Sequence, residues 1–390
     1  MNRAKVMSFI KANTMIIALV VITAFFVWQT GGKIILPQNV SNLISQNAYV
    51  FVLATGMLLC ILTGGNIDLS VGSVVCIVGA AGATLMENRD VHWVIAVIFM
   101  LILGIAIGAW QGFWIAYVRV PPFICTLAGM LIFRGLSNII LDGLTVSLTN
   151  TTFIRLFGGG ADCYISDLFS VEGFNLTAMV AGIITSVIYI IIQIQGRVKK
   201  IRKGYEIEPI QNMLIRSVII SAVIIAFSFQ LSRYRGIPTA LVIVVIVVLV
   251  YGYITSKTVL GRHFYAVGGN EKAARLSGIN TNRIYFIAYT NMGFLSALAG
   301  MLTIARFTSA QPSYGQNYEM DAIASCFIGG ASAYGGTGKV SGVIIGALLM
   351  GVINIGMSIK GVDSNWQKVV KGLVLLGAVI FDVVSKKKNN

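Results

Sequence analysis

Long apolar runs recur along the whole chain, and they limit what it can fold into. A run of about 17 to 25 apolar residues is long enough to cross a bilayer as a helix. The 390 residues are 56% hydrophobic and 11% charged, whereas soluble domains carry about 25% charged residues. The sequence therefore predicts an all-α polytopic integral membrane protein.

The runs that qualify as spans cover residues 14 to 30, 40 to 62, 67 to 86, 93 to 117, 122 to 141, 175 to 195, 212 to 230, 237 to 256, 284 to 305, 338 to 358 and 367 to 384. One further run, from Asp321 to Gly335, is too short to span and is rich in Ala, Ser and Gly, which favours a half-helix or re-entrant piece. We expect about ten to twelve transmembrane helices with interrupted or re-entrant segments, all in a single domain over 1–390.

The formal charge of +15 does not indicate nucleic-acid binding, because the basic residues fall in short loops and form no continuous stripe. Basic loops mark the cytoplasmic side. If the spans alternate, the N-terminus, Arg119, a basic loop at 197–211, the loop at 257–283 and the Lys-rich tail share that side. Both termini are then cytoplasmic, and the long loop at 142–174 is extracytoplasmic.

The stretch "LTGGNIDLSVGS" places polar residues between two apolar runs. Polar groups at membrane depth are costly and are often functional. A structural role is also open, since Asp68 is suited to cap a helix that starts near Leu69. Residues 64–80 also resemble residues 329–347, because both begin with paired glycines and enter an apolar helix that ends in Gly-Ala. This echo indicates either a structural repeat or two helices with small residues at their contacts.

Hydrolytic chemistry finds little support in the sequence. "GGTGKV" around Lys339 lacks the first glycine and the final Ser or Thr of a phosphate-binding loop. The two histidines, His92 and His263, have no catalytic or metal-binding pattern around them. We therefore predict that this chain is not an enzyme and holds no metal. An ion-coupled carrier stays open as the alternative, with Asp68 as its main ionisable candidate.

"NEKAARLSGIN" lies in the basic loop at 257–283 and has the pattern of a short soluble helix. Asn270 is a plausible N-cap, and Gly278 would end the helix. An exposed helix of this kind can receive force from a soluble partner.

Five motifs resemble, in order, the permease subunits of bacterial ABC sugar importers of the ribose, xylose and galactose type: "LTGGNIDLSVGS", "RVPPFICTLAGMLIFRG", "GRHFYAVGGNEKAARLSGIN", "YEMDAIASCFIGGASAYGGTGKVSG" and "WQKVVKGLVLLGAVIFDV". An additional pair of spans around 197–203 is most similar to the xylose or multiple-monosaccharide branch. The resemblance implies an inner-membrane permease that imports a pentose or hexose, such as xylose, arabinose, galactose or ribose, by alternating access.

The resemblance also implies the partners. They are a second copy of the chain, an ATPase subunit that holds ATP and Mg, and an extracytoplasmic sugar-binding protein that largely sets specificity. No cofactor is expected on this chain. The resemblance places a coupling loop at 261–280, in which the residues expected to contact the ATPase are Asn270, Glu271, Lys272, Arg275, Leu276 and Gly278. Without the resemblance, these would be solvated residues of a basic loop.

A translocation path is the other site that the resemblance implies. Its expected residues are Gly64, Gly65, Asn66, Asp68, Ser70 and Asn354, although Asn354 is equally suited to a hydrogen bond between helices. The binding protein is expected to dock on Arg306, Tyr314, Tyr318 and Trp366. Aromatic residues at a membrane boundary also serve as interfacial anchors.

Overall fold

The computed structural model describes residues 14–169, 173–205 and 209–387. The long helices are α2 (Thr14–Gln29), α3 (Pro37–Leu62), α4 (Val71–Ala83), α5 (Trp93–Ala116), α6 (Pro122–Leu141), α8 (Leu176–Arg202), α9 (Ile210–Ser232), α10 (Thr239–Lys257), α13 (Thr281–Phe307), α15 (Val340–Ile359) and α16 (Ser364–Lys387). The short elements are η1 (Lys33–Ile35), η2 (Thr84–Asn88), β1 (Val146–Ser147), α7 (Thr151–Leu156), α11 (Val259–Gly269), α12 (Glu271–Leu276), β2 (Ser309–Ala310) and α14 (Tyr318–Ile328).

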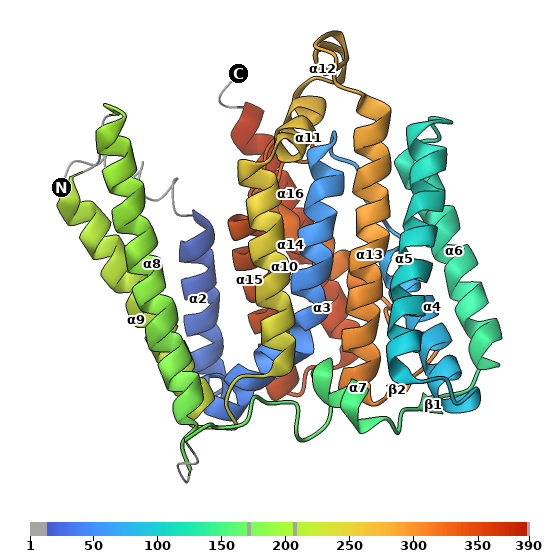
Figure 1. The fold of residues 1–390 in the computed structure, drawn as a ribbon, viewed down its shortest axis with the longest axis horizontal. Helices are drawn as coiled ribbons and strands as arrows, with labels where there is room; N and C mark the ends of the chain where they lie inside the picture. The colour runs from blue at the N-terminus through green and yellow to red at the C-terminus, as the bar shows by residue number, and fades with distance from the viewer. Residues whose placement is uncertain (1–13, 170–172, 206–208, 388–390) are drawn as a thin grey trace.

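The all-helical, membrane-spanning architecture predicted from the apolar runs is confirmed. Within the described ranges, nine helices are long and apolar enough to cross a membrane, counting α4 together with η2. Helix α12 projects beyond the bundle at one end, which we call the α12 side, and α11 lies among the helix ends below it (Figure 1). Helix α7 and the strands lie at the opposite end, the α7 side (Figure 1).

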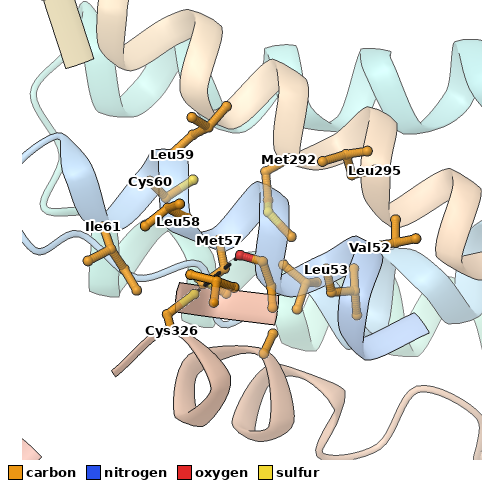
Figure 2. Packing of buried hydrophobic residues seen from close by; sticks show 14 of the residues in the cluster. Val52, Leu53, Met57, Leu58, Leu59, Cys60, Ile61, Met292, Leu295 and Cys326 are labelled. Carbon is orange, nitrogen blue, oxygen red and sulfur yellow. Dashed lines mark hydrogen bonds between the residues drawn. The ribbon is translucent and has the colours of Figure 1, made fainter. Parts of the chain in front are cut away.

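Helix α3 is the centre of the bundle. In the most apolar stretch of α3, 89% of the residues are buried, against 17% in the corresponding stretches of α8 and α9. Helices α8 and α9 pair at one edge of the molecule (Figure 1). Gly56 lets α3 approach α13, since a β-carbon there would lie 2.7 Å from the Met292 sulfur. On another face, the Cys326 thiol of α14 donates to the Ala54 carbonyl at 3.2 Å (Figure 2).

Three glycines spaced four residues apart join α5 to α13. Gly104, Gly108 and Gly112 form one stripe of α5, and the backbone of α13 lies directly on it. A β-carbon at position 104 would lie 2.6 Å from the Gly293 carbonyl oxygen. Small residues at this spacing allow close helix packing in lipid, where van der Waals contact replaces the hydrophobic effect between helices.

The two long loops contain more regular structure than the sequence indicates. In 142–174, Asn150 caps α7, and β1 pairs antiparallel with β2 at Val146↔Ala310; residues 170–172 lie outside the described part. In 197–211, α8 continues to Arg202, so the first basic residues are helical rather than in a loop. Lys and Arg are good helix formers, and their long stems keep the charges in water.

Candidate functional site

The polar stretch after α3 is a break between two helices. Gly64 and Gly65 have φ angles of 129° and 75°, which glycine adopts without steric cost. Asp68 is 2% exposed, and its Oδ1 accepts from the Ser70 amide at 2.8 Å and from the Ser70 hydroxyl at 2.7 Å. Gln111 of α5 donates to the same hydroxyl at 2.8 Å. Asp68 thus stabilises the turn that precedes α4, a structural role, although α4 begins only at Val71, with Ser70 as its N-cap and no side-chain capping hydrogen bond.

A second break of the same design follows α14. This helix has 11 residues, about 16 Å at 1.5 Å per residue, so it covers about half of a 30 Å hydrocarbon core. Gly330 has a φ of 80°, and irregular backbone continues until α15 begins at Val340. The run from Asp321 to Gly335 is therefore part half-helix and part irregular loop, consistent with the expected half-helix or re-entrant piece.

The two breaks touch each other, which the sequence echo did not reveal. The Gly336 amide donates to the Leu62 carbonyl at 3.1 Å. A β-carbon on Gly335 would lie 2.5 Å from the Gly64 Cα, and one on Gly65 would overlap the Ala333 carbonyl oxygen. We call residues 62–70 and 329–339 together the paired breaks. Backbone meets backbone here, so the two helix interruptions form one structural unit.

The paired breaks lie directly beneath the loop at 261–280. A β-carbon on Gly268 of α11 would overlap the Leu62 carbonyl oxygen and lie 2.6 Å from the Gly336 amide nitrogen. The Tyr265 hydroxyl donates to the Gly338 carbonyl at 2.8 Å. Helix α11 therefore rests on both interruptions at once.

Helix α12 follows α11 and faces away from the bundle at its tip. The Asn270 side chain accepts from the Ala273 amide at 2.9 Å, and Gly278, at a φ of 84°, follows the helix end. Lys272 and Arg275 are exposed, and Leu276 is 90% exposed. The helix that the capping pattern predicts is present, with its largest apolar side chain uncovered.

Glu271 fastens α12 to the bundle. Its carboxylate lies 2.9 Å from the Arg119 guanidinium and accepts from the Tyr285 hydroxyl of α13 at 3.1 Å. Partial burial raises the pKa of Glu271, but hydrogen bonds from Arg119 and Tyr285 outweigh it and leave the pKa below the ordinary 4.5. The carboxylate is therefore charged at neutral pH and holds the loop before α6, α12 and α13 together.

A polar cavity of about 340 Å³ lies at the α7 side, between α3, α13, α14, α15 and α16. Nine of its twelve lining residues carry hydroxyl, amide or cationic groups; only Ala48, Leu302 and Phe307 do not. The Asn354 amide, on the wall, donates to the Asn47 carbonyl oxygen at 3.2 Å. Asn354 thus makes the interhelical bond and lines a cavity as well.

Two residues expected at the surface line this cavity instead of standing apart from it. Arg306, in the last turn of α13, lies at the wall, and the Tyr318 ring stacks on Tyr49 with 3.6 Å between centroids. Tyr314 lies outside the lining and stacks on the lining residue Phe307 at 4.6 Å. Trp366, in the first turn of α16, is 65% exposed and also lies outside. Docking of the binding protein on these four residues stays a prediction.

Sequence reasoning missed a buried ion pair behind the cavity. Lys371 Nζ lies 2.9 Å from Oδ1 and 3.0 Å from Oδ2 of Asp321, and the Tyr49 hydroxyl donates to Oδ2 at 2.7 Å. The two side chains are 18% and 1% exposed. The available signal was an acidic residue in the apolar α14 and a lysine well inside α16. Among the described residues, no cluster of His, Cys, Asp and Glu could hold a metal ion.

Comparisons with known proteins agree over nearly the whole chain. Residues 39–379 match the family model described as the permease component of the branched-chain amino acid transport system. The chain is 36% identical to the xylose transport system permease protein XylH of Escherichia coli K12, covering 96% of this chain and 92% of that protein.

Two further relatives extend the match. The chain is 38% identical to the XylH protein of Haemophilus influenzae, covering 96% of both chains. It is 36% identical to the ribose import permease protein RbsC of E. coli K12, covering 88% of this chain and 85% of that protein. No solved structure matches.

Proposed function

The chain belongs to the sugar permeases of ABC transporters, in the branch of the xylose permeases, and we propose that it is the membrane-spanning subunit of an ATP-driven importer that carries a monosaccharide into the cytoplasm. It is a multi-pass inner-membrane permease and not an enzyme, because its relatives are transport permeases. ATP and Mg belong to a separate ATPase subunit. The ion-coupled alternative is not favoured by these relatives.

The contact between α11 and the paired breaks is the observation that carries this proposal. An ATPase that docks on α12 would move α11, and Gly268 of α11 touches Leu62 and Gly336, one from each break. Discontinuous helices often form the substrate site of a transporter, and in alternating access one part of the bundle moves against another around that site. A movement of α11 would therefore act directly on both helix breaks, because α11 contacts each of them.

Docking on the ATPase is assigned to the exposed side of α12. Leu276 is the apolar knob, because a leucine that is 90% exposed in a membrane protein's soluble loop has found no partner within the described chain. Lys272 and Arg275 orient the contact through charge. Asn270 and Gly278 define the ends of the helix, and Glu271 anchors it to Arg119.

The proposed orientation puts the α12 side and both termini in the cytoplasm, as the basic loops indicate. The first thirteen residues and the last three lie outside the described part. The α7 side then faces the sugar-binding protein, and Tyr314 and Trp366 lie at that end. A second copy of the chain completes the transporter.

The substrate proposed is a pentose or hexose, with xylose and ribose as the first candidates. These are the sugars in the names of the relatives. The cavity at the α7 side supports a hydrophilic substrate, since nine of its twelve lining residues carry a group that can form hydrogen bonds. The breaks' own polar residues, Asn66, Asp68 and Ser70, are proposed to lie along the path.

Purification of the complex through a tag on this chain tests the proposal. We expect an ATPase to copurify, with hydrolysis that rises when binding protein and D-xylose or D-ribose are added. The double variant Arg275→Ala/Leu276→Ala should lose both the ATPase and the stimulation. Leu249→Ala, which removes a leucine that is 67% exposed in the middle of α10 and lies at neither end of the bundle, should change neither. Intact stimulation in the double variant would refute the assignment of α12.

A further inference from the structure

The cavity at the α7 side has the chemistry of a sugar site on the permease itself. Resting on the proposed import function, we propose that it binds an uncharged monosaccharide, with Lys371, Arg306 and the amide pair Asn47 and Asn354 as its hydrogen-bonding groups. Selection of the sugar would then occur twice, first in the binding protein and again in this cavity.

The size and lining of the cavity fit a small polyol. Its volume of about 340 Å³ lies at the lower end of the range of about 300 to 1,000 Å³ for small-molecule pockets. Three quarters of its lining residues bear a polar group, although the surrounding helices are apolar. Polar groups inside a membrane bundle are rare, and they mark substrate pathways when they gather around one space.

Asp321 and Tyr49 hold the Lys371 ammonium in place at the cavity wall. Asp321 holds the ammonium through both carboxylate oxygens, and Tyr49 holds the carboxylate. An ammonium has three donors, and Asp321 Oδ2 accepts from one of them, so that donors remain for a ligand hydroxyl. A buried ion pair is weak evidence for stability, since desolvation opposes the attraction. Because Lys371 lines the cavity, we assign the ion pair a role in ligand binding as well as in folding.

The charges at the cavity disfavour a cationic ligand. Asp321 neutralises Lys371, and no carboxylate stands among the residues that line the cavity. Arg306 is the remaining cation, and it forms no ion pair within the described residues. A guanidinium offers five donors and can bind several hydroxyls of one sugar. Hydrogen bonds without an ionic partner remain weak enough for the sugar to leave.

Helix α14 connects this cavity to the paired breaks. Tyr318 and Asp321 lie in its first turn, at the cavity, and its other end leads into residues 329–339. The helix is a rigid element of 11 residues, so a shift at Asp321 is carried to the break that touches α11. Occupancy of the cavity can therefore be felt at the coupling loop.

Protection of an introduced thiol tests the site in the complete complex. Ser45→Cys places a thiol on the cavity wall without removing one of the four proposed sugar-binding groups, and Ser358→Cys places one on α15 at an exposed position outside the lining. A small uncharged thiol reagent should modify position 45 more slowly when D-xylose or D-ribose is present. Position 358 should react at an unchanged rate. Thr303→Cys is a second reporter from α13, and the unsubstituted chain gives the background of its five native cysteines.

The ion pair is tested on the same reporter. Lys371→Met combined with Asp321→Asn removes both charges together, so no lone buried charge is left. The sugar concentration that gives half protection should rise about tenfold or more, as expected for a lost hydrogen bond to a charged donor. Lys368→Met, which removes an exposed lysine one turn earlier on α16, should leave the concentration unchanged.

Two results would overturn the inference: equal modification rates with and without 100 mM of either sugar at both reporters, or protection by D-xylonate alone. ATPase activity stimulated by the binding protein is measured in the same preparation. Stimulation without protection rejects the cavity site and leaves the import function standing. Protection without any stimulation supports a sugar site and rejects the ATP-driven function.

Discussion

Gly65 packs against the carbonyl oxygen of Ala333, so that one helix break has no room for a side chain because the other break fills the space. The two residues are far apart in the sequence: Gly65 belongs to the Gly-Gly pair after α3, and Ala333 follows the Gly-Gly pair after α14. The bonds and contacts around them, including the Gly336 amide on the Leu62 carbonyl, make the paired breaks the structural centre of the α12 side.

Gly65→Ala should disrupt this centre. Its φ of 75° and the overlap with Ala333 both oppose a side chain. Gly143→Ala is the matched control, because Gly143 has a φ of 70° with nothing within 4 Å of a β-carbon. The conformational cost of about 1 to 2 kcal/mol is common to both. We expect Gly65→Ala to lower the free energy of unfolding by about 2 kcal/mol more than the control, measured by thermal denaturation in detergent. Equal losses would show that the contact is not tight.

Two neighbouring glycines of α11 should behave in opposite ways. Gly268→Ala forces a methyl group into the Leu62 carbonyl and toward the Gly336 amide, whereas Gly269→Ala meets nothing within 4 Å. We expect Gly268→Ala to lose most sugar uptake while the protein still reaches the membrane. Gly269→Ala should retain uptake and gain up to about 1 kcal/mol of helix stability. Normal transport by Gly268→Ala would contradict the contact between α11 and the breaks.

Substitutions at Asp68 distinguish a structural role in the turn before α4 from a role in ion coupling. Asp68→Asn keeps an oxygen acceptor for the Ser70 amide and hydroxyl, so we expect uptake and thermal stability close to those of the unsubstituted protein. Asp68→Ala removes the acceptor and should cost about 1 kcal/mol. Parallel uptake and thermal denaturation measurements check both variants. If Asp68→Asn abolishes uptake without a loss of stability, the carboxylate charge itself is needed.

The junction between Glu271 and Arg119 should weaken in acid. The pKa of Glu271 is lower in the folded protein than its ordinary 4.5, so its stabilising contribution is complete above pH 4.5 and is lost as the pH falls through the lowered pKa. Both side chains are more than a third exposed, which limits the effect to less than about 1 kcal/mol. Thermal denaturation between pH 7 and pH 3.5 should show a smaller acid loss in Glu271→Gln than in the unsubstituted protein. Identical pH dependence in the two proteins would show that the Glu271–Arg119 ion pair does not stabilise the fold.

Much of the fold could be predicted from the sequence, because span length and polarity are local properties. The run at 14 to 30 became α2, and the run at 122 to 141 became α6. The short helix after Asn270 was predictable for the same reason, since its N-cap and the glycine that follows it lie next to it in the sequence. The family resemblance is confirmed by the relatives and rests on motifs in the right order.

The rest depends on contacts between distant segments. The sequence echo did not show that the breaks touch, because backbone contact at glycine leaves no side-chain pattern to read. Arg306 and Tyr318 were expected to contact the binding protein, and the sequence did not show that packing brings them together with Asn354 around one cavity. The pairing of Lys371 with Asp321 could not be derived from either residue alone. The assigned roles of the coupling and path residues stay predictions.

The central claim is that ATP, and not an ion gradient, drives sugar entry through this chain. We would measure accumulation of labelled D-xylose and D-ribose in proteoliposomes that contain the permease, with ion gradients collapsed. The account predicts accumulation of at least one sugar only when the copurifying ATPase, ATP and the binding protein are all present. Accumulation by the permease alone in response to a proton or sodium gradient would contradict it.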